Sequence, residues 1–269
     1  MSRATADRPS RRIAVALDAS PSSQHSLGLI AAIAAALDAE LEGIFVEDTE
    51  LLRTAGLPFL REIRLASLCE SVLDAERLGR ELRAAARRVR AQLERSATER
   101  GLAWSFRVWR GDLEAEILGA ALDAEWFALG RIGRFAPLPR LGRKQPPSHA
   151  RPGALRVGVL QTGGEATARA LAIALELARR GTAEPILILQ AEDASAMARL
   201  REQVMARLGA AGALASLLTL QSVEPARLAA MVRASRIDLM ILEETNPLLA
   251  KTALWSSLET LGCPVVIGR

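Results

Sequence analysis

Two glycines, Gly130 and Gly133, follow a short apolar segment and raise the first chemical question about this chain. Residues 127–133 read Phe-Ala-Leu-Gly-Arg-Ile-Gly, which is typical of a buried strand that breaks into a glycine-marked loop. Glycine lets the backbone approach a bound group closely and point its N–H groups at an anion such as a phosphate. The pattern indicates a candidate anion-binding loop, with a plain turn at the end of a strand as the alternative.

The second half of the chain reaches the same point with different residues. Residues 240–246 read Met-Ile-Leu-Glu-Glu-Thr-Asn, so Glu243 and Asn246 stand where the two glycines stand in the first half. Together with Glu244, two carboxylates would lie beside any phosphate bound there and would repel it. We therefore expect an anion site in the first half only.

Basic residues gather around and after the glycine loop. No acidic residue occurs between Glu125 and Glu165, although arginine and lysine recur throughout this segment. Arg143 and Lys144 could supply positive charge to a phosphate, because a guanidinium group binds phosphate in a bidentate manner. A solvated linker explains the same bias equally well.

Strands that alternate with helices must position this loop. In the first half the predicted strands are residues 12–18, 41–46, 102–109 and 126–129, and the predicted helices are 21–37, 61–100 and 112–123. In the second half the predicted strands are 156–160, 185–190, 214–220, 238–242 and 264–267, and the predicted helices are 166–180, 194–208, 225–235 and 248–261. This alternation favours an α/β fold with two open, mostly parallel, doubly wound sheets in tandem, in domains that span residues 1–150 and 151–269.

Composition indicates a soluble protein of the cytoplasm. Hydrophobic residues make up 50% of the chain and charged residues 25%, and the longest apolar run, residues 27–37, is too short to span a membrane. Residues 1–12 are polar and basic, so we predict no secretory signal. Cys69 and Cys263 lack metal-ligand spacing and fit two thiols in a reducing compartment. A general nucleic-acid surface normally shows lysine and arginine clustered on one face with aromatic residues between them. We identify no such face in the sequence, which argues against nucleic acid as a partner.

Histidines and acidic residues offer weaker candidates. His25 and His149 lie on different segments with no nucleophile arranged near them, so surface or core roles are favoured over catalysis. Glu47, Asp48 and Glu50 follow the second predicted strand and could hold a metal ion. A solvated loop is the favoured interpretation of these three carboxylates.

Four arginines lie on one face of the long predicted helix 61–100. Their spacing by three or four residues brings them together along the helix. Such a row indicates a solvated face or, as the alternative, a surface for a partner. The four residues are Arg80, Arg83, Arg87 and Arg90.

The beginning and the end of the chain resemble the universal stress protein family. Residues 13–20 (Ile-Ala-Val-Ala-Leu-Asp-Ala-Ser), followed by a predicted helix and then by residues 43–48 (Gly-Ile-Phe-Val-Glu-Asp), are similar to the opening of the family. Residues 238–242 and 262–267 are similar to the end of a domain of the same family. Because the resemblance covers both halves, we interpret the chain as a tandem universal stress protein whose second domain is degenerate.

The resemblance implies a set of nucleotide-contacting residues in the first half. ATP-binding members carry a Gly-x2-Gly-x9-Gly-Ser/Thr signature after the fourth strand, an aspartate ending the first strand and a valine ending the second. The residues in the corresponding places are Asp18, Val46, Gly130, Ile132, Gly133, Gly142 and Arg143. Eight residues, one fewer than in the signature, separate Gly133 from Gly142, and Arg143 replaces the hydroxyl residue. ATP is therefore an optional cofactor of the first half, and we expect none in the second, where Gln161 takes the place of Asp18.

The same resemblance predicts how the two halves meet. Residues 143–155 are too short and proline-rich for another helix and strand, so the first domain lacks its last helix and strand and has four strands against five. The backbone of residues 126–129 would then form an open edge. In single-domain members the last strand pairs with its symmetry mate across a dimer. We expect residues 265–267 to cover the edge within the chain, as an internal pseudo-dimer, or in a second chain, as a homodimer.

Three functions are compatible with this interpretation. The first is a non-enzymatic stress-response protein that acts through an unidentified protein partner, with nucleotide optional. The second is an ATP-binding sensor that uses the first domain only. The third, a nucleotide hydrolase, is disfavoured because no motif places a base near the glycine loop.

Overall fold

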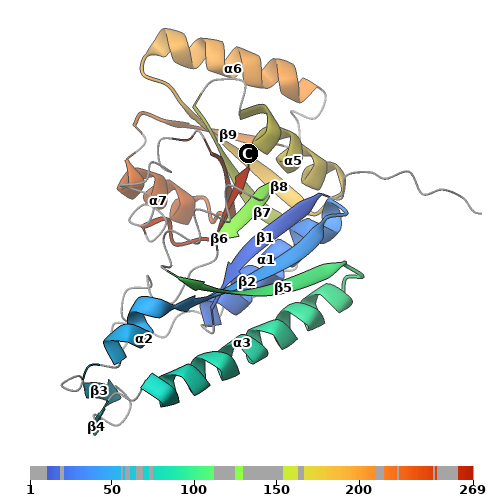
Figure 1. Ribbon diagram of the computed structural model, residues 1–269. Helices are drawn as coiled ribbons and strands as arrows, with labels where there is room; N and C mark the ends of the chain where they lie inside the picture. Colours follow the sequence, from blue (N-terminus) through green and yellow to red (C-terminus); the bar gives the residue numbers. More distant parts are fainter. Residues whose placement is uncertain are drawn as a thin grey trace, which may run out of the picture.

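An α/β fold with one central sheet is seen in the computed structural model of the chain (Figure 1). We call residues 12–129 the N-terminal half and residues 155–268 the C-terminal half. The structure describes residues 11–18, 21–55, 57, 61–64, 69–72, 75–111, 125–129, 154–162, 167–209, 215–222, 224–244, 246 and 260–268.

Strands and helices alternate through both halves. The elements of the N-terminal half are β1 (Arg12–Leu17), α1 (Pro21–Ala36), β2 (Glu40–Asp48), α2 (Thr49–Ala55), β3 (Arg61–Arg64), β4 (Cys69–Val72), α3 (Ala75–Thr98), β5 (Trp104–Gly111) and β6 (Trp126–Leu129). Those of the C-terminal half are β7 (Leu155–Gln161), α5 (Thr167–Arg179), β8 (Ala183–Gln190), α6 (Ala194–Leu208), β9 (Ser216–Leu220), α7 (Pro225–Ala234), β10 (Leu239–Glu243) and β11 (Val265–Gly268). The strands predicted from apolar runs are present, with ends that differ by a few residues.

Among the residues that the structure describes, nine strands form a single sheet in the order β5-β2-β1-β6-β11-β10-β7-β8-β9. Each neighbouring pair is parallel except β6 and β11, which are antiparallel. The α/β class, the mostly parallel pairing and the division into four and five strands are confirmed. The expectation of two separate sheets was wrong, because the two sets of strands join edge to edge.

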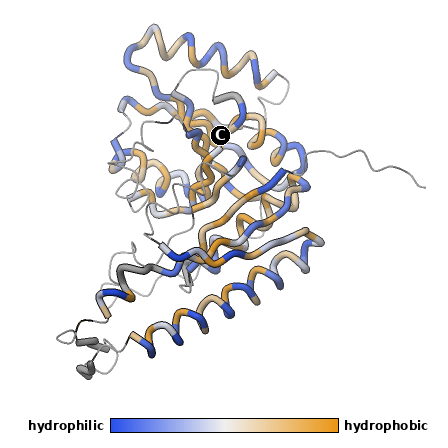
Figure 2. The backbone as a smooth tube through the Cα atoms, viewed as in Figure 1, coloured by the Kyte–Doolittle hydropathy of each residue, from blue (hydrophilic) through white to orange (hydrophobic). Residues whose placement is uncertain are grey.

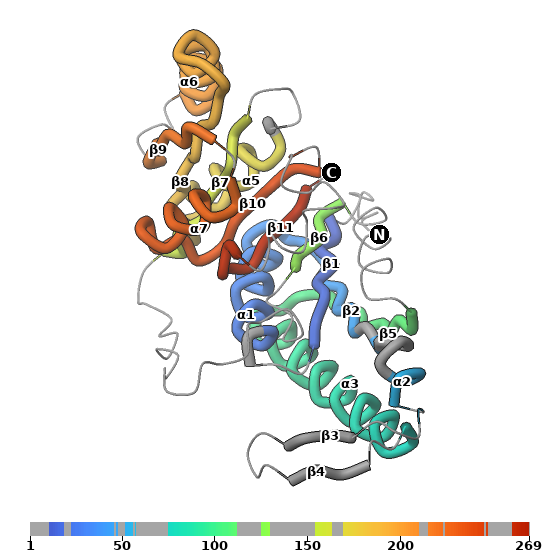
Figure 3. Tube along the Cα trace, turned by 90° about the vertical axis from the view of Figure 1, so that its left-hand side faces the viewer, coloured from blue at the N-terminus to red at the C-terminus, as the bar shows by residue number. Residues whose placement is uncertain are grey.

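The join is made by the strand that we expected to reach across (Figure 3). Val265 lies opposite Leu129, Val266 opposite Ala128 and Ile267 opposite Phe127. All of these side chains are buried. The prediction that residues 265–267 cover the edge of residues 126–129 is confirmed, and the cover comes from the same chain.

Gly268 ends this seam and lies opposite Trp126. A Cβ atom at this position would lie 2.2 Å from the Trp126 ring. The absence of a side chain therefore lets the indole pack directly over the backbone of β11, as glycine in a strand often allows.

The prediction of one helix over residues 61–100 was wrong in its first part. Within this range, β3 and β4 form an antiparallel pair in which Arg61 pairs with Val72, and α3 begins only at Ala75. The apolar residues of the hairpin also fit a helical spacing, which made the two structures hard to separate. Serine, cysteine and valine, which are weak helix formers, are frequent in residues 67–72 and favour the extended structure.

Helices cover both faces of the sheet. One face packs against α1, α3, α5 and α6, whose apolar residues share one cluster with Val15 of β1 and Val159 of β7. The opposite face packs against α7, with Leu228 and Val232 in a second cluster. Figure 2 shows the strands as mainly hydrophobic and α3 as alternately hydrophobic and hydrophilic along its length. None of the described helices is long and apolar enough to cross a lipid bilayer.

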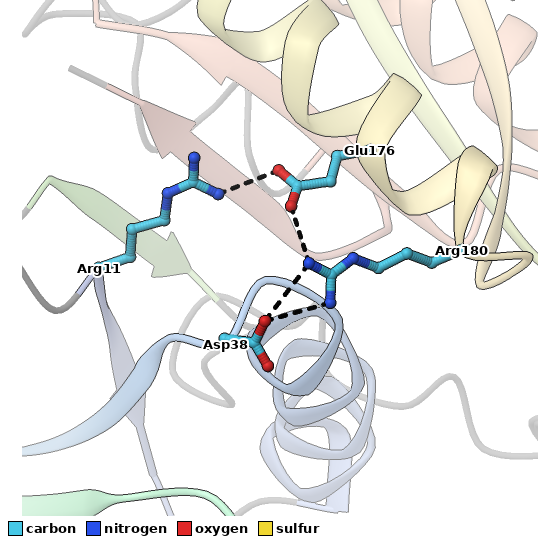
Figure 4. A network of polar contacts seen from close by, with 4 residues as sticks. All are labelled: Arg11, Asp38, Glu176 and Arg180. Carbon is cyan, nitrogen blue, oxygen red and sulfur yellow. Dashed lines mark hydrogen bonds and ion pairs between the residues drawn. The ribbon is translucent and has the colours of Figure 1, made fainter. Parts of the chain in front are cut away.

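Polar contacts on the surface also connect the two halves (Figure 4). Arg11 Nη1 lies 3.0 Å from Glu176 Oε2 at α5, and Arg180 Nη1 lies 3.3 Å from Asp38 Oδ2 just after α1. Arg180 Nη2 also lies 3.1 Å from Glu176 Oε1. The four side chains form a chain of alternating charge across the ends of α1 and α5.

Candidate functional site

The candidate site lies at the carboxyl ends of the parallel strands, the edge at which ligands bind in open α/β sheets. In the N-terminal half this edge is formed by β2, β1 and β6. Leu17 pairs with Phe45, so Asp18 and Val46 come next to each other in register. Ala16 pairs with Leu129, which places the end of β6 at the same edge. The topology therefore brings the predicted strand-end residues together.

Asp18 directly follows β1 and contacts the first turn of α1. Its backbone N–H donates a hydrogen bond of 3.0 Å to Oγ of Ser23, a buried residue in the first turn of α1. This contact holds the beginning of α1 against the end of β1. The remaining predicted site residues, Gly130, Ile132, Gly133, Gly142 and Arg143, lie outside the described residues.

The matching edge of the C-terminal half is formed by β7 and β10. Val159 pairs with Ile241, just as Val15 pairs with Ala128 in the N-terminal half. If β10 is matched to β6 with Glu243 on Gly130, this register matches Gln161 to Leu17 and Thr162 to Asp18. The assignment of Gln161 to the place of Asp18 was therefore off by one residue, because sequence patterns do not determine how strands align.

Glu243 and Gln161 are buried side chains at the ends of these two strands. Their exposed fractions are 5% and 0%. Because side chains alternate along a strand, Glu243 shares a face with Leu239 and Ile241, which pack in the cluster that contains α5. Glu243 is thus directed to the α5 side of the sheet.

The Glu243 carboxylate contacts the first turn of α5. Its Oε1 accepts a hydrogen bond of 3.2 Å from the backbone N–H of Ala170. The first N–H groups of a helix have no partner within the helix and carry the positive end of its dipole, so an anion is stabilised there. Glu243 supplies that anion from within the chain.

Burial and hydrogen bonding act on Glu243 in opposite directions. Burial raises the pKa of the carboxyl group above its ordinary value, because removal from water disfavours the charged form. The backbone N–H groups of Ala170 and Arg169 and the charges of Arg169 and Arg207 offset part of this rise. The second oxygen, Oε2, is buried and has no hydrogen-bond partner among the residues that the structure describes.

The loop that follows β10 is held by backbone contacts. The N–H of Asn246 donates to the carbonyl oxygen of Glu243 at 2.8 Å, and the N–H of Glu244 donates to the carbonyl oxygen of Gly268 at 2.9 Å. Asn246 is buried and Glu244 is exposed. Only one of the two carboxylates predicted to repel a phosphate therefore lies inside the protein.

The acidic cluster after β2 differs from the solvated loop that we expected. Glu47 and Asp48 belong to β2, and Glu50 belongs to α2. Glu47 is buried, and its Oε2 lies 2.8 Å from Nε of Arg110 on the neighbouring strand β5. Glu47 is thus a paired structural carboxylate. The described residues contain no group of three metal-binding side chains.

Two features of possible function were missed in the sequence. The contact between Glu243 and α5 could have been suspected from a carboxylate that ends an apolar strand beside the start of a helix. Glu42 is a further buried carboxylate, paired with Arg107 of β5 and, at 3.3 Å, with Arg12 of β1. Its only signal was a charge inside an apolar strand, which does not identify the partners.

Among the comparisons with known proteins, the comparison with solved structures informs the fold. No family model and no curated protein sequence matches the chain. A universal stress protein from Archaeoglobus fulgidus DSM 4304 superposes with a TM-score of 0.56 at 15% identity, over 96% of this chain and 96% of that chain. This likeness shows that the chain has the fold of universal stress proteins over nearly its whole length.

Shorter and more distant structures are also similar. A universal stress protein in complex with cAMP has a TM-score of 0.35 at 18% identity and covers 44% of this chain and 98% of its own. A protein of the universal stress protein family from Burkholderia pseudomallei has a TM-score of 0.31 at 15% identity, over 78% of this chain and 96% of its own.

Proposed function

We propose that this chain is a stress-response protein of the universal stress type, which acts by binding another protein and not by catalysis. Adenine nucleotide is an optional ligand of the N-terminal half. The shared fold supports the general class. The observation that carries the proposal for the ligand is the Glu243 carboxylate on the first turn of α5.

Glu243 argues for at most one nucleotide per chain. Its carboxylate already satisfies the N–H group of Ala170 that a phosphate would need, and it would repel a second negative charge beside it. In the N-terminal half the matching strand β6 ends at Leu129, and a glycine follows. A phosphate could approach the backbone there without meeting a side chain.

Binding of ATP to the purified full-length chain tests this proposal. Native mass spectrometry and equilibrium dialysis should give no more than one ATP per chain. Gly133→Asp should abolish that binding, because it places a carboxylate in the proposed phosphate path. Gly79→Asp on α3 is the matched control, since the new Cβ would meet only the end of the Arg83 side chain, at 3.5 Å. Two nucleotides per chain, or unchanged affinity in Gly133→Asp, would contradict the assignment.

Two further measurements separate the three functions. If the protein is a nucleotide sensor, its association with partners should change when ATP is added, whereas a constitutive interaction protein should associate equally with and without it. Release of inorganic phosphate above the level of the Gly133→Asp variant would support a hydrolase and contradict the non-enzymatic proposal.

We also propose that the two halves form an internal pseudo-dimer and that the protein works in the cytoplasm. The antiparallel pairing of β6 with β11 supports the first proposal, because one strand of the C-terminal half completes the sheet of the N-terminal half. A single chain in solution, measured by light scattering, would fit a pseudo-dimer that needs no second copy. A stable homodimer would show that an additional interface exists.

A further inference from the structure

The outer edge of β5 and the adjacent flank of α3 form one continuous surface. We call it the β5–α3 surface and define it by Arg83, Arg87 and Arg90 of α3 and by Trp104, Phe106, Val108 and Arg110 of β5. Figure 1 shows α3 running alongside β5, the last strand at this end of the sheet.

Hydrogen-bonding groups of the β5 backbone point outward from the sheet. The N–H of Leu41 donates to the carbonyl oxygen of Ala103, so residues 105, 107 and 109 also direct their N–H and C=O groups to β2. In a parallel pair the residues between them direct these groups the other way. The outward residues are therefore Trp104, Phe106, Val108 and Arg110. Within the described ranges, no strand pairs with them.

Edge strands are commonly protected by being short or by carrying proline or charged residues. β5 has eight residues and no proline, and its only charged residues are the arginines Arg107 and Arg110. The side chain of Val108 points to the same face of the sheet as α3, and 41% of the residue's surface is exposed. The opposite edge of the sheet, β9, is only five residues long. Among the described residues, β5 is thus the longer of the two strands that end the sheet.

Arginines line the side of α3 that faces this edge. The guanidinium of Arg90 lies 6.0 Å from the centre of the Trp104 ring, which fixes its place beside the beginning of β5. Arg83 lies about 10 Å further back along the helix. That distance corresponds to about three residues along a strand. Because α3 and β5 run in opposite directions, Arg83 therefore lies beside β5 about three residues after Trp104, near Val108. Arg83 and Arg87 are exposed, and no described carboxylate pairs with either.

We propose that the β5–α3 surface binds an extended acidic segment of a partner protein, which adds to β5 as a further strand. The outward N–H and C=O groups would pair with the backbone of the segment. Every second side chain of the segment would face α3, at intervals of about 6.7 Å, and glutamate or aspartate there would meet the arginines. This inference names the surface for the protein interaction that the proposed function requires, and it rests on that proposed function.

A second copy of this chain fits the surface poorly. Antiparallel pairing of two β5 edges into a continuous sheet would place both α3 helices on the same face and side by side. Their arginine flanks would then oppose each other and repel. The charge of the surface therefore favours an acidic partner over self-association.

Hydrogen exchange followed by NMR on the full-length chain tests the proposal without a mutation. The probe is a short synthetic peptide in which glutamate alternates with valine. Bound peptide should slow the exchange of the amides of Trp104, Phe106, Val108 and Arg110. The amides that face β2 should be protected already and should change little. Slowed exchange confined to other segments would overturn the proposal.

Two pairs of variants separate backbone pairing from charge. Val108→Pro removes an outward N–H but no bond to β2, a change that an edge strand tolerates, and should weaken peptide binding about tenfold or more. Val108→Thr keeps the N–H and should bind with an affinity near that of the parent. The double variant Arg83→Glu with Arg87→Glu should also weaken binding at least about tenfold. Arg201→Glu, an exposed arginine on α6, is its control.

Each outcome decides between distinct conclusions. If the arginine variant abolishes binding and Val108→Pro does not, the surface binds polyanions such as nucleic acid, and strand addition is wrong. If the peptide instead drives formation of dimers, or the free chain already pairs through β5, the acidic-partner proposal is overturned. If neither variant affects binding but the protein still associates with partners, the assignment of the β5–α3 surface as the binding site is wrong, while the proposed function stands. Circular dichroism of each variant confirms that it is folded.

Discussion

The two halves of this molecule have similar strand arrangements, but the corresponding strands β6 and β10 end in very different ways. In the C-terminal half, β10 ends in the buried Glu243, whose carboxylate contacts the first turn of α5, and the half has its own fifth strand, β11. In the N-terminal half, β6 ends before a glycine, and its edge is covered by β11 of the other half. The C-terminal half thus completes itself, whereas the N-terminal half depends on its neighbour.

This comparison separates two uses of one topology. A helix that follows a parallel strand directs its N-terminus to the carboxyl edge of the sheet, and that position favours an anion. A side-chain carboxylate can occupy it permanently, as Glu243 does at α5. Where the chain places no side chain, a ligand can occupy the position. One substitution at the end of a strand can therefore decide between a structural and a binding role.

Removal of β11 should cause the largest loss of stability, and the loss should extend to both halves. Val265, Val266 and Ile267 are buried between β6 and β10. Burial of each side chain contributes about 2 kcal/mol, so deletion of residues 264–269 should cost several kcal/mol of the free energy of unfolding. Hydrogen exchange should show lost protection at residues 126–129 as well as at residues 239–243.

A milder variant keeps this test decisive if the truncated chain does not fold. Val266→Ala should cost about 1 to 2 kcal/mol and should accelerate exchange in both β6 and β10. If the β6 amides keep full protection while the β10 amides lose it, the N-terminal half does not depend on β11. That result would contradict the difference between the two halves described above.

Gly268→Ala should disturb the seam less than removal of β11 does. The new methyl group would lie 2.2 Å from the rigid Trp126 ring, so the indole must move. We expect a loss of about 2 kcal/mol in the free energy of unfolding and a change in tryptophan fluorescence. Gly158→Ala is a useful contrast, because its nearest contact, at 2.3 Å, is the Sδ atom of the flexible Met240 side chain. A larger loss for Gly158→Ala would contradict the assigned packing of Trp126.

Glu243→Ala should remove the carboxylate from the first turn of α5 and leave this position free for an added anion. Loss of the carboxylate leaves the N–H of Ala170 without its acceptor, at a cost of about 1 kcal/mol. Added phosphate should restore stability in this variant by up to a similar amount, because an anion is favoured at the start of α5. Glu244→Ala, at the exposed neighbour, measures the general effect of phosphate. Equal stabilisation of the two variants would show that Glu243 does not occupy an anion site.

The pH dependence of stability should change in Glu243→Gln. Because the pKa of Glu243 is raised in the folded protein, the folded state holds its proton more tightly than the unfolded state does. The stability of the parent chain, relative to Glu243→Gln, should therefore be greatest below the ordinary pKa of glutamate. This relative stability should fall as the pH rises through the pKa that Glu243 has in the folded protein. Denaturant titrations across this range measure the difference, and a relative gain in stability with rising pH would contradict the burial of the carboxylate.

Glu176→Gln should have the smallest effect. Glu176 lies between Arg11 and Arg180 on the surface of the junction (Figure 4). Exposed ion pairs contribute little, so we expect a loss below about 1 kcal/mol that shrinks further at high salt. A large, salt-independent loss would mean that these contacts, and not the β6–β11 seam, hold the halves together.

The strand pattern of both halves could be predicted from the sequence alone. Apolar runs such as residues 13–17 and 239–242 can be buried on both faces only in a parallel sheet covered by helices. The short, proline-rich connection after the glycine loop likewise indicated that the first set of strands was incomplete. The hairpin of β3 and β4 was missed, because its apolar residues satisfy the periods of both a strand and a helix.

Local sequence determined which residues form the strands and the strand ends of this protein, because backbone propensity and apolar pattern act over a few neighbouring residues. Only the tertiary structure decided that nine of the described strands form one sheet, that Val159 pairs with Ile241, and that Glu243 reaches Ala170 from 73 positions away in the chain. It also decided which edge of β5 pairs with no described strand. These features depend on the register and order of strands, which follow from packing between segments distant in the sequence and leave no local pattern.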